Sequence, residues 1–485
     1  MSSATSSTER PALSFVLWRT SNIAVGQRLT RFPHPAHAVT GQACSGCGSA
    51  GVARAPTTPL PKRDGTIRGK SFCPQVGEAV FQKLTERYLA SWPARLLAVA
   101  AALLVAAALT FWLPYTWPYR IDIDVYRLGG RAFLDGADLY GRLPDTEVGA
   151  NLPFTYPPIA AALFSLFAIM PLRAASTLLS ILSVMAMGWL LALVLREVTR
   201  RTTSEALWLA LPVLALISWL GPMRENIEFG QINVLLMALV LTDVLAGQGK
   251  PWRGWLTGLA VAIKLTPAVF LVYFLLRRDW RSLIMTVVSF AVYTAIGFAL
   301  RPADSVEYWT SALRDTGRIG NAGFPSNLSI NGFVHRLGFD GTAASVGWFV
   351  VSAAVGLAIM WIAWKLLQAD QKAAAALVVG FIALFCSPVS WGHHWVWALP
   401  MLVVFAVWAA QGIAPRVAWL VLLVTGAYIF WALPQWWFPS SEGETPEWNI
   451  LQQLVGSAYL VWAAAALVVM AVFWRSRPVA VPAGN

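Results

Sequence analysis

Charged side chains are scarce in this chain. They make up 12% of its 485 residues, whereas a soluble domain carries roughly 25%. The deficit extends over most of the sequence, and apolar runs of ~17–25 residues, each long enough to cross a bilayer, recur from Leu96 to Trp474. This scarcity excludes an ordinary soluble domain. It predicts an all-α, polytopic integral membrane protein of about 10–13 spans, with the lipid bilayer as a partner.

Cysteine is also rare. Two of the four cysteines, Cys44 and Cys47, form a lone CxxC motif, and the other two lie far from it. A structural zinc site needs four ligands, usually from two such pairs. His34 and His37 could complete a set, but the residues around them are mostly Ser, Gly, Ala and Pro without a hydrophobic pattern. We therefore expect no metal site and no cofactor.

A folded basic domain is missing as well, although the net charge is +12. Residues 1–95 hold 12 basic and 4 acidic residues, and much of the remaining excess lies in short segments such as Arg196–Arg201 and Arg277–Arg281. Basic residues placed in this way are typical topology signals of membrane proteins. We therefore expect no nucleic-acid partner.

The first 90 residues show no sustained helical or strand period and are rich in Ser, Ala, Pro, Arg and Gly. Such a stretch has too little apolar surface to offset chain entropy, and Phe15–Trp18 is too short an apolar core for a signal peptide. We expect the following division: residues 1–90, a disordered cytoplasmic tail or a start codon placed too far upstream; 91–477, one membrane domain with a first outer loop at 114–173 and a large outer loop at 301–344; and 478–485, a cytoplasmic tail.

Basic residues before the first predicted span, Leu96–Leu113, place the preceding tail in the cytoplasm. The apolar stretch Pro157–Met170 would reach only about 21 Å as a helix, less than the ~30 Å hydrocarbon core, so we expect it to lie at the outer interface. Trp255–Leu276 has basic residues at both ends, which predicts a broken hairpin with Lys264–Pro267 at its outer tip. All polar, aromatic-rich loops then fall on the outer side: 119–156, 224–231, 308–336, 387–394 and 434–448.

Two acids, Asp122 and Asp124, lie in the string Arg120–Tyr126 just after the first predicted span. An acid at a membrane boundary is costly unless it is solvated or functional. Either one, taken alone, could be a solvated loop residue. Side chains at i and i+2 of an extended segment point to opposite faces, so we expect one of the two to face a site.

Further polar residues gather in the other outer strings. Lys264 lies within an otherwise apolar 22-residue stretch, where a lysine indicates a functional site; the alternative is a structural pair with Glu228. His393 and His394 follow Ser387–Gly392, and three metal ligands with catalytic spacing are absent. We expect the following residues to bind substrate: Tyr126, Tyr156, Glu228, Gln231, Asn233, Lys264, His393 and His394.

Five strings carry a resemblance to a known family: IDIDVYRLGGRAFLDGADLY, NLPFTYPP, FGQINVLLMALVLTD, AIKLTPAVFLVYFLLRRD and SPVSWGHHWVWALP. Together, over about 118–474, they resemble the polyprenol-phosphate-mannose-dependent mannosyltransferases of glycosyltransferase family 87, in the GT-C superfamily. The likeness is greatest to the α-(1→2)-mannosyltransferases of the lipomannan and lipoarabinomannan pathway.

The resemblance implies a catalytic acid in the first outer loop and a donor, polyprenyl-phosphate-mannose, that reaches the site from the lipid phase. It implies inverting transfer to a lipoglycan acceptor, at the extracytoplasmic face of the plasma membrane. We expect Asp122 to be the general base, because it better matches the family's catalytic position. Asp124 is the reserve, since pairing with Arg127 or Arg131 would give it a structural role.

Three alternatives stay open. The acceptor could be a phosphatidylinositol mannoside, or the donor a polyprenyl-phosphate-arabinofuranose. A lipid or sugar transporter, from a different class, would suit an intramembrane lysine and a broken helix. No convincing inverted repeat relates the two halves of the chain, and the polar motifs lie only on the predicted outer side.

Overall fold

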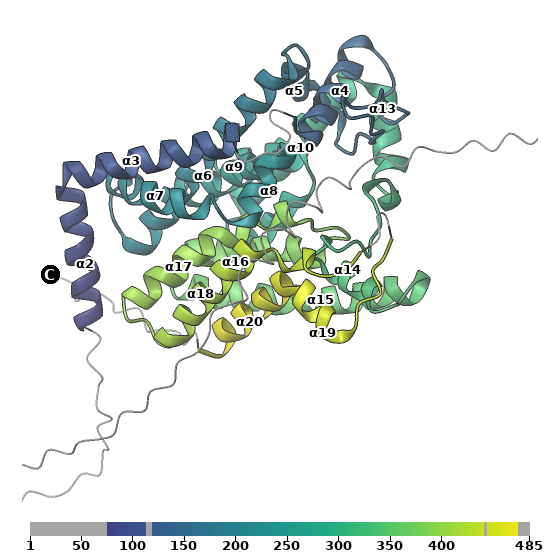
Figure 1. Ribbon diagram of the computed structural model, residues 1–485. Coiled ribbons are helices and arrows are strands. Elements are labelled where there is room, and N and C mark those ends of the chain that lie inside the picture. The colour runs from purple at the N-terminus through teal and green to yellow at the C-terminus, as the bar shows by residue number, and fades with distance from the viewer. Residues whose placement is uncertain (1–74, 113–118, 441–443, 474–485) are drawn as a thin grey trace, which may run out of the picture. The chain divides into compact units, whose positions relative to one another are not determined.

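The computed structural model describes residues 75–112, 119–440 and 444–473, and every regular element within these ranges is helical (Figure 1). The predicted all-α fold class is confirmed. The tail sites considered above, Cys44, Cys47, His34 and His37, lie outside the described residues. The expected tail boundary at residue 90 coincides with the end of a helix, α2, so the last part of that segment, from Gln75, is helical.

In the first half of the described chain the helices are α2 (Gln75–Ala90), α3 (Trp92–Ala107), η2 (Ala108–Trp112), α4 (Ile121–Asp135), α5 (Pro158–Ala168), α6 (Leu172–Thr199), α7 (Thr203–Ile217), α8 (Gly221–Phe229), α9 (Asn233–Leu241), η3 (Thr242–Ala246), α10 (Trp255–Ile263), η4 (Thr266–Val269), α11 (Phe270–Leu276) and α12 (Trp280–Leu300). The second half contains α13 (Pro302–Glu307), η5 (Tyr308–Ala312), η6 (Thr316–Ile319), α14 (Ile330–Arg336), α15 (Gly341–Gln368), α16 (Lys372–Cys386), η7 (Gly392–Trp397), α17 (Ala398–Ala410), α18 (Arg416–Ala432), η8 (Pro434–Trp436), α19 (Ile450–Gly456) and α20 (Ala458–Phe473).

Six helical segments of the described chain are long and apolar enough to cross a membrane, or eight if two bent pairs, α7 with α8 and α19 with α20, each count as one span. This is fewer than the 10–13 spans expected. The difference arises because α9 with η3, η4 with α11, and α16 are apolar but only 10–17 residues long. The stretch predicted to lie at the interface is also short, since α5 has 11 residues.

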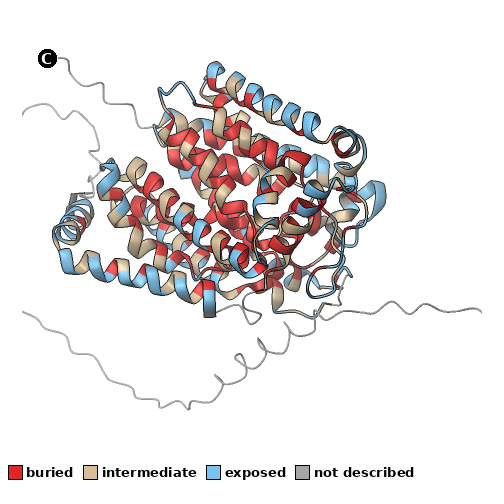
Figure 2. Ribbon diagram, turned by 90° about the horizontal axis from the view of Figure 1, so that it is seen from above, coloured by how far each residue is buried: buried red, intermediate tan, exposed pale blue. Residues whose placement is uncertain are grey.

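Burial separates central spans from peripheral ones. In the most apolar windows of α6 and of η7 with α17, 61% and 78% of the residues are buried, against 17% in α12 and in α15. Figure 2 shows the same arrangement, with buried residues in the middle of the bundle and exposed residues on its outer helices. Because the exposed residues of α12 and α15 are largely apolar, these two helices suit a lipid-facing position.

Hydrogen bonds and other contacts join the segments between helices into two groups. In the basic group, Arg200 pairs with Asp370 at 2.6 Å, and Gln411 donates to the Val198 carbonyl at 3.2 Å. In the polar, aromatic-rich group, contacts link all five loops expected on the outer side: Tyr126 with Gln231, Phe229 with His393, Asn327 with Pro388, and Asn321 with Thr445. The functional candidates therefore share one end of the fold.

Local sequence explains how two elements reach this end. Helix α4 begins with Asp122 and Asp124 in its first turn, where negative charge is favoured by the helix dipole, and stops at Gly136 with φ +71°. Helix α10 ends at Ile263 and is followed by Lys264, whose backbone is extended (φ −150°, ψ 127°), and Pro267 in the next turn cannot continue the helix. The predicted break at Lys264–Pro267 is thus present.

Candidate active site

Asp122 lies in the first turn of α4, outside the membrane-spanning helices, and is partly accessible. One carboxylate oxygen, Oδ2, accepts a hydrogen bond from Nε2 of Gln231 at 2.7 Å. Burial raises the pKa of Asp122 to about 6, while the Gln231 hydrogen bond and the positive charge of Lys264 act in the opposite direction. A carboxylate with this pKa is ionised at neutral pH and can accept a proton.

Asp124 has different partners. Its Oδ1 lies 3.4 Å from Nη1 of Arg127, and its Oδ2 accepts the backbone N–H of Glu147 at 2.9 Å. The side chain is 2% exposed. The segment is helical rather than extended, but residues two apart on a helix also point in different directions. Of the two predicted acids, only Asp122 therefore joins the network described below.

Two tyrosines connect Asp122 to Lys264 through Gln231. The hydroxyl of Tyr126 donates to Oε1 of Gln231 at 3.0 Å and lies 2.8 Å from the hydroxyl of Tyr156. A tyrosine hydroxyl has one proton, so Tyr156 must donate to Tyr126. Lys264 donates to the Tyr156 oxygen at 3.5 Å. Each hydrogen bond in this series therefore has one direction: Lys264 donates to Tyr156, Tyr156 to Tyr126, and Tyr126 to Gln231. The carboxamide nitrogen of Gln231 then donates to the Asp122 carboxylate.

Lys264 faces a histidine as well as this chain. Its ammonium donates to Oδ1 of Asn233 at 3.0 Å and lies 3.5 Å from Nε2 of His394. The backbone N–H of Trp391 donates to Nδ1 of His394 at 3.1 Å, so in the neutral ring the proton is on Nε2. Two donors, the ammonium and Nε2–H, thus face each other. Such a pair is suited to bind an anion placed between them.

His393 and Glu228, the other predicted site residues, are not members of the hydrogen-bond series from Lys264 to Asp122. His393 accepts a bond from Asn233 through its carbonyl, and its buried ring packs against Phe229 and His394 at centroid distances of 5.4 and 4.7 Å. Glu228 lies 3.9 Å from Arg224. The suggested pair between Glu228 and Lys264 is wrong, because Lys264 instead contacts Asn233, Tyr156 and His394.

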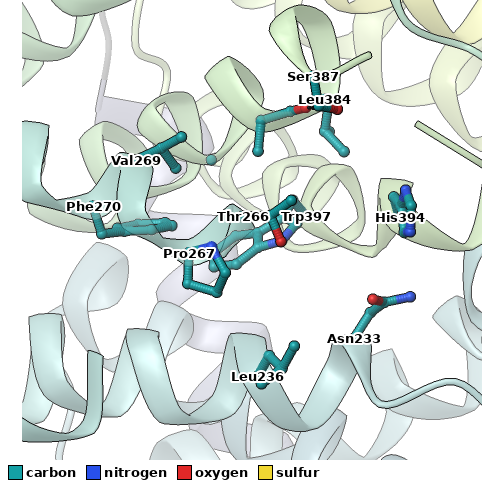
Figure 3. A pocket seen from close by; sticks show the side chains of 12 residues that line it. Asn233, Leu236, Thr266, Pro267, Val269, Phe270, Leu384, Ser387, His394 and Trp397 are labelled. Atoms are coloured by element: carbon teal, nitrogen blue, oxygen red, sulfur yellow. Dashed lines mark hydrogen bonds between the residues drawn. The ribbon is translucent and has the colours of Figure 1, made fainter. Parts of the chain in front are cut away.

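A small cavity of about 40 Å³ adjoins this network (Figure 3). Asn233 and His394 provide polar atoms at one side, and most of the other lining side chains are apolar, from α9, η4, α16 and η7. The lining residues are Asn233, Leu236, Thr266, Pro267, Val269, Phe270, Gly380, Ala383, Leu384, Ser387, His394 and Trp397. In the described ranges no group of three or more His, Cys, Asp or Glu side chains could hold a metal ion.

Comparison with known proteins places this chain in a family. Residues 154–388 match the family model of glycosyltransferase family 87. The chain is 43% identical, over 382 residues, to the polyprenol-phosphate-mannose-dependent α-(1-2)-phosphatidylinositol mannoside mannosyltransferase of Mycolicibacterium smegmatis, covering 74% of this chain and 85% of that protein. It is 41% identical to the protein of the same description from Mycobacterium tuberculosis, covering 73% and 84%.

The chain belongs to glycosyltransferase family 87. It is also 31% identical, over 72% of its length and 83% of the relative, to a phosphatidylinositol pentamannoside mannosyltransferase of Mycobacterium tuberculosis. No solved structure matches the chain. The family assignment establishes a glycosyltransferase, and the alternative of a transporter is therefore set aside.

The sequence strings that carry the resemblance of this glycosyltransferase to its family contain charged or aromatic residues. They do not include every residue that shapes the candidate site. Asn327 and Ser326, in the large outer loop, hold the segment that carries the histidines. The backbone amide of Trp391, which orients His394, has no side-chain signal. Only the clustering of Ser326, Asn327 and Ser329 without charge could have indicated a buried polar contact.

Proposed function

We propose that this glycosyltransferase moves mannose from polyprenyl-phosphate-mannose to a phosphatidylinositol mannoside, with inversion and formation of an α-(1→2) linkage. The donor and the linkage follow the printed descriptions of relatives 41–43% identical to the chain. Those descriptions favour the phosphatidylinositol mannoside alternative over the lipomannan acceptor expected from sequence. The observation that carries the proposal is the pair of facing donors on Lys264 and His394, linked through one network to the carboxylate of Asp122.

We assign the donor phosphate to Lys264 and His394. The ammonium and Nε2–H are 3.5 Å apart, and an anionic oxygen would accept from both. The adjoining cavity turns from polar side chains, Asn233 and His394, to apolar ones such as Leu236 and Phe270 (Figure 3). A lipid phosphate has the same sequence of polar and apolar parts. We therefore assign the apolar side of the cavity to the first part of the polyprenyl chain.

Asp122 acts as the general base. It takes the proton of the acceptor hydroxyl as that oxygen bonds to C1 of mannose, and the bond from C1 to the phosphate oxygen breaks with inversion. The products are the α-mannoside and polyprenyl phosphate, and Asp122 then releases its proton to water. Negative charge grows on the leaving phosphate, where Lys264 and His394 stabilise it.

The catalytic side is extracytoplasmic. Arg127, on the same helix as Asp122, donates to the Met170 carbonyl just before α6, whereas Arg196 and Arg200 lie at the other end of this 28-residue helix. Basic connectors of this kind are retained in the cytoplasm. This arrangement supports a multi-pass protein of the plasma membrane whose site opens outward. The acceptor glycan then arrives from the aqueous side and the donor from the bilayer.

A second candidate keeps the site and changes the sugar. Over 152 residues, which is 30% of this chain and 35% of the relative, the chain is 30% identical to an α-(1->3)-arabinofuranosyltransferase of Corynebacterium glutamicum. This partial match favours, at most, a shared way of binding the polyprenyl phosphate. The longer matches to mannosyltransferases make mannose the better assignment.

The purified protein in lipid nanodiscs tests the proposal by a donor swap. We expect radiolabelled mannose to pass from polyprenyl-phosphate-mannose to phosphatidylinositol mannosides, with an α-(1→2) linkage in the product. Polyprenyl-phosphate-arabinofuranose should give no product above the no-enzyme background. Transfer from the arabinose donor alone would overturn the donor assignment. Transfer of mannose to lipomannan, with none to phosphatidylinositol mannosides, would overturn the acceptor.

A further inference from the structure

The segment that carries the histidines is held by a buried side chain outside it. Asn327 lies in the large outer loop and is 0% exposed. Its Nδ2 donates to the carbonyl of Pro388 at 3.1 Å, and its Oδ1 accepts the N–H of Ser390 at 3.0 Å. One asparagine thus satisfies two backbone groups on either side of Val389.

Neighbouring residues of the outer loop extend this attachment. The backbone N–H of Leu328 donates to the carbonyl of Ser390 at 2.8 Å. Asn331 donates to the carbonyl of Pro388 at 3.0 Å. The conformation of 388–390 is therefore fixed by several bonds from one short segment, with Asn327 supplying both a donor and an acceptor.

The bonds that hold 388–390 influence the position of His394 through one peptide unit. The carbonyl of Ser390 and the N–H of Trp391 belong to the same peptide unit, which is rigid and planar. The Leu328 N–H holds this carbonyl, and Asn327 holds the N–H of the same residue, Ser390, in the preceding peptide unit. The direction of the Trp391 N–H is thereby fixed, and it donates to Nδ1 of His394 at 3.1 Å. That bond puts the proton of the neutral ring on Nε2, which faces Lys264 at 3.5 Å.

We infer that Asn327 is a positioning residue for transfer: it holds the backbone of 388–390 through Pro388 and Ser390. Together with the Leu328 N–H, this places the Ser390–Trp391 peptide, which sets the orientation and tautomer of His394. The inference rests on the proposed role of His394 in binding the donor phosphate. Asn327 itself contacts neither donor nor acceptor. Its loss should therefore change donor use through the histidine and leave acceptor use unchanged.

A double-mutant cycle tests this coupling in nanodiscs. Asn327→Ala and His394→Ala should each lower kcat/KM for polyprenyl-phosphate-mannose by about tenfold to a hundredfold, the effect of losing one charge-assisted hydrogen bond. The double variant should be no worse than His394→Ala alone, because both changes remove the same contact. KM for the acceptor should stay within about twofold, since additivity errors are of that size.

The matched control is Asn449→Ala. Asn449 caps α19 and is exposed, so this change also removes an asparagine hydrogen bond, but not one to the histidine segment. It should leave KM for the donor unchanged. Activities are expressed per folded molecule, measured by thermal unfolding of the same samples.

The outcomes separate the two proposals. If the losses of Asn327→Ala and His394→Ala multiply in the double variant, Asn327 does not act through His394, and the inference falls while the proposed function stands. If polyprenyl-phosphate-mannose is no donor for the wild type, the proposed function falls by itself. Should Asn327→Ala fail to fold, Asn331→Ala removes only one bond to Pro388; a smaller loss that vanishes in the His394→Ala background supports the inference, and an additive loss overturns it.

Discussion

At the scale of single residues, the two acids of the first outer loop make different contacts although they are two positions apart. Asp122 faces Gln231 and the network of Lys264, whereas Asp124 is bound by Arg127 and the Glu147 amide. The sequence alone suggested this division, because pairing with Arg127 or Arg131 would give Asp124 a structural role. The partner of Asp122 could not be predicted in this way, since Gln231 is more than a hundred residues away.

Asp122→Asn keeps the shape of the side chain and removes the base. We expect normal folding and donor binding, with transfer reduced by about 10²–10⁴-fold, the usual contribution of a general base. The control Asp124→Asn loses the ion pair with Arg127 and should keep most of the transfer per folded molecule. Radiolabelled mannose transfer measures both variants. An active Asp122→Asn with an inactive Asp124→Asn would mean that the other carboxylate is the base.

The pH profile reports the same carboxylate. A base must be ionised, so kcat/KM should fall as the pH drops through about 6, the pKa of Asp122. The Gln231 hydrogen bond favours the charged form; Gln231→Leu removes it, raises the pKa and should move the acid limb to higher pH. Gln248→Leu, whose side chain bonds to the Leu245 carbonyl near the basic connectors, is the control. An unchanged acid limb in Gln231→Leu would contradict this assignment.

At the scale of secondary-structure elements, the break between α10 and η4 brings a lysine into the site. Lys264 donates to Asn233 and Tyr156 because the helix stops there and the backbone becomes extended. The break could be predicted from Pro267 and the basic flanks. The close packing that fixes its position could not, because it depends on α12 lying against α10.

Lys264→Met removes the ammonium while keeping a long side chain. We expect kcat/KM for the donor to fall by about tenfold to a hundredfold, as a charge-assisted bond is lost. Lys250→Met, in the basic connector before α10, is the control and should be near wild type. Unchanged donor binding and turnover in Lys264→Met would exclude the lysine from the site.

The contact of α10 with α12 depends on Gly258. A Cβ at this position would lie 2.5 Å from the carbonyl oxygen of Thr286 and 2.5 Å from Cβ of Ser289. Gly258→Ala should therefore lower the free energy of unfolding by about 1–3 kcal/mol, the cost of overpacking, and weaken donor use by shifting Lys264. In α15, a Cβ at Gly356 would meet only Sγ of Cys386 at 3.9 Å. Thermal unfolding in detergent should show Gly356→Ala at or above wild type; equal losses in the two variants would refute the packing argument.

At the scale of the whole molecule, the sequence predicted the helical fold, the family and the gathering of five loops at one end. It overestimated the number of full spans, because apolar composition does not reveal where a helix of 10–17 residues stops. It also missed Asn327, whose role depends on distant backbone groups at Pro388 and Ser390. Charge and aromatic patterns thus identified the side chains of the candidate site better than those that support them.

The sidedness of the fold can be measured by cysteine labelling. In a variant without the four native cysteines, Val148→Cys lies in the exposed part of the first outer loop, and Ser204→Cys lies in the exposed first turn of α7 beside the basic connector. A membrane-impermeant maleimide should label Val148→Cys in intact cells and Ser204→Cys only after permeabilisation. The opposite pattern would place the site in the cytoplasm.

The hydrogen-bond chain from Lys264 to Asp122 passes through the carboxamide of Gln231, which joins Tyr126 on its oxygen to Asp122 on its nitrogen. A carboxamide transmits polarisation, but its nitrogen gives up no proton at physiological pH. No proton therefore passes through Gln231 between Lys264 and Asp122. The charge of Lys264 can thus influence the pKa of Asp122 without proton exchange between the two groups. In the proposed reaction, a proton taken from the acceptor therefore leaves Asp122 for water, because this side chain is partly accessible.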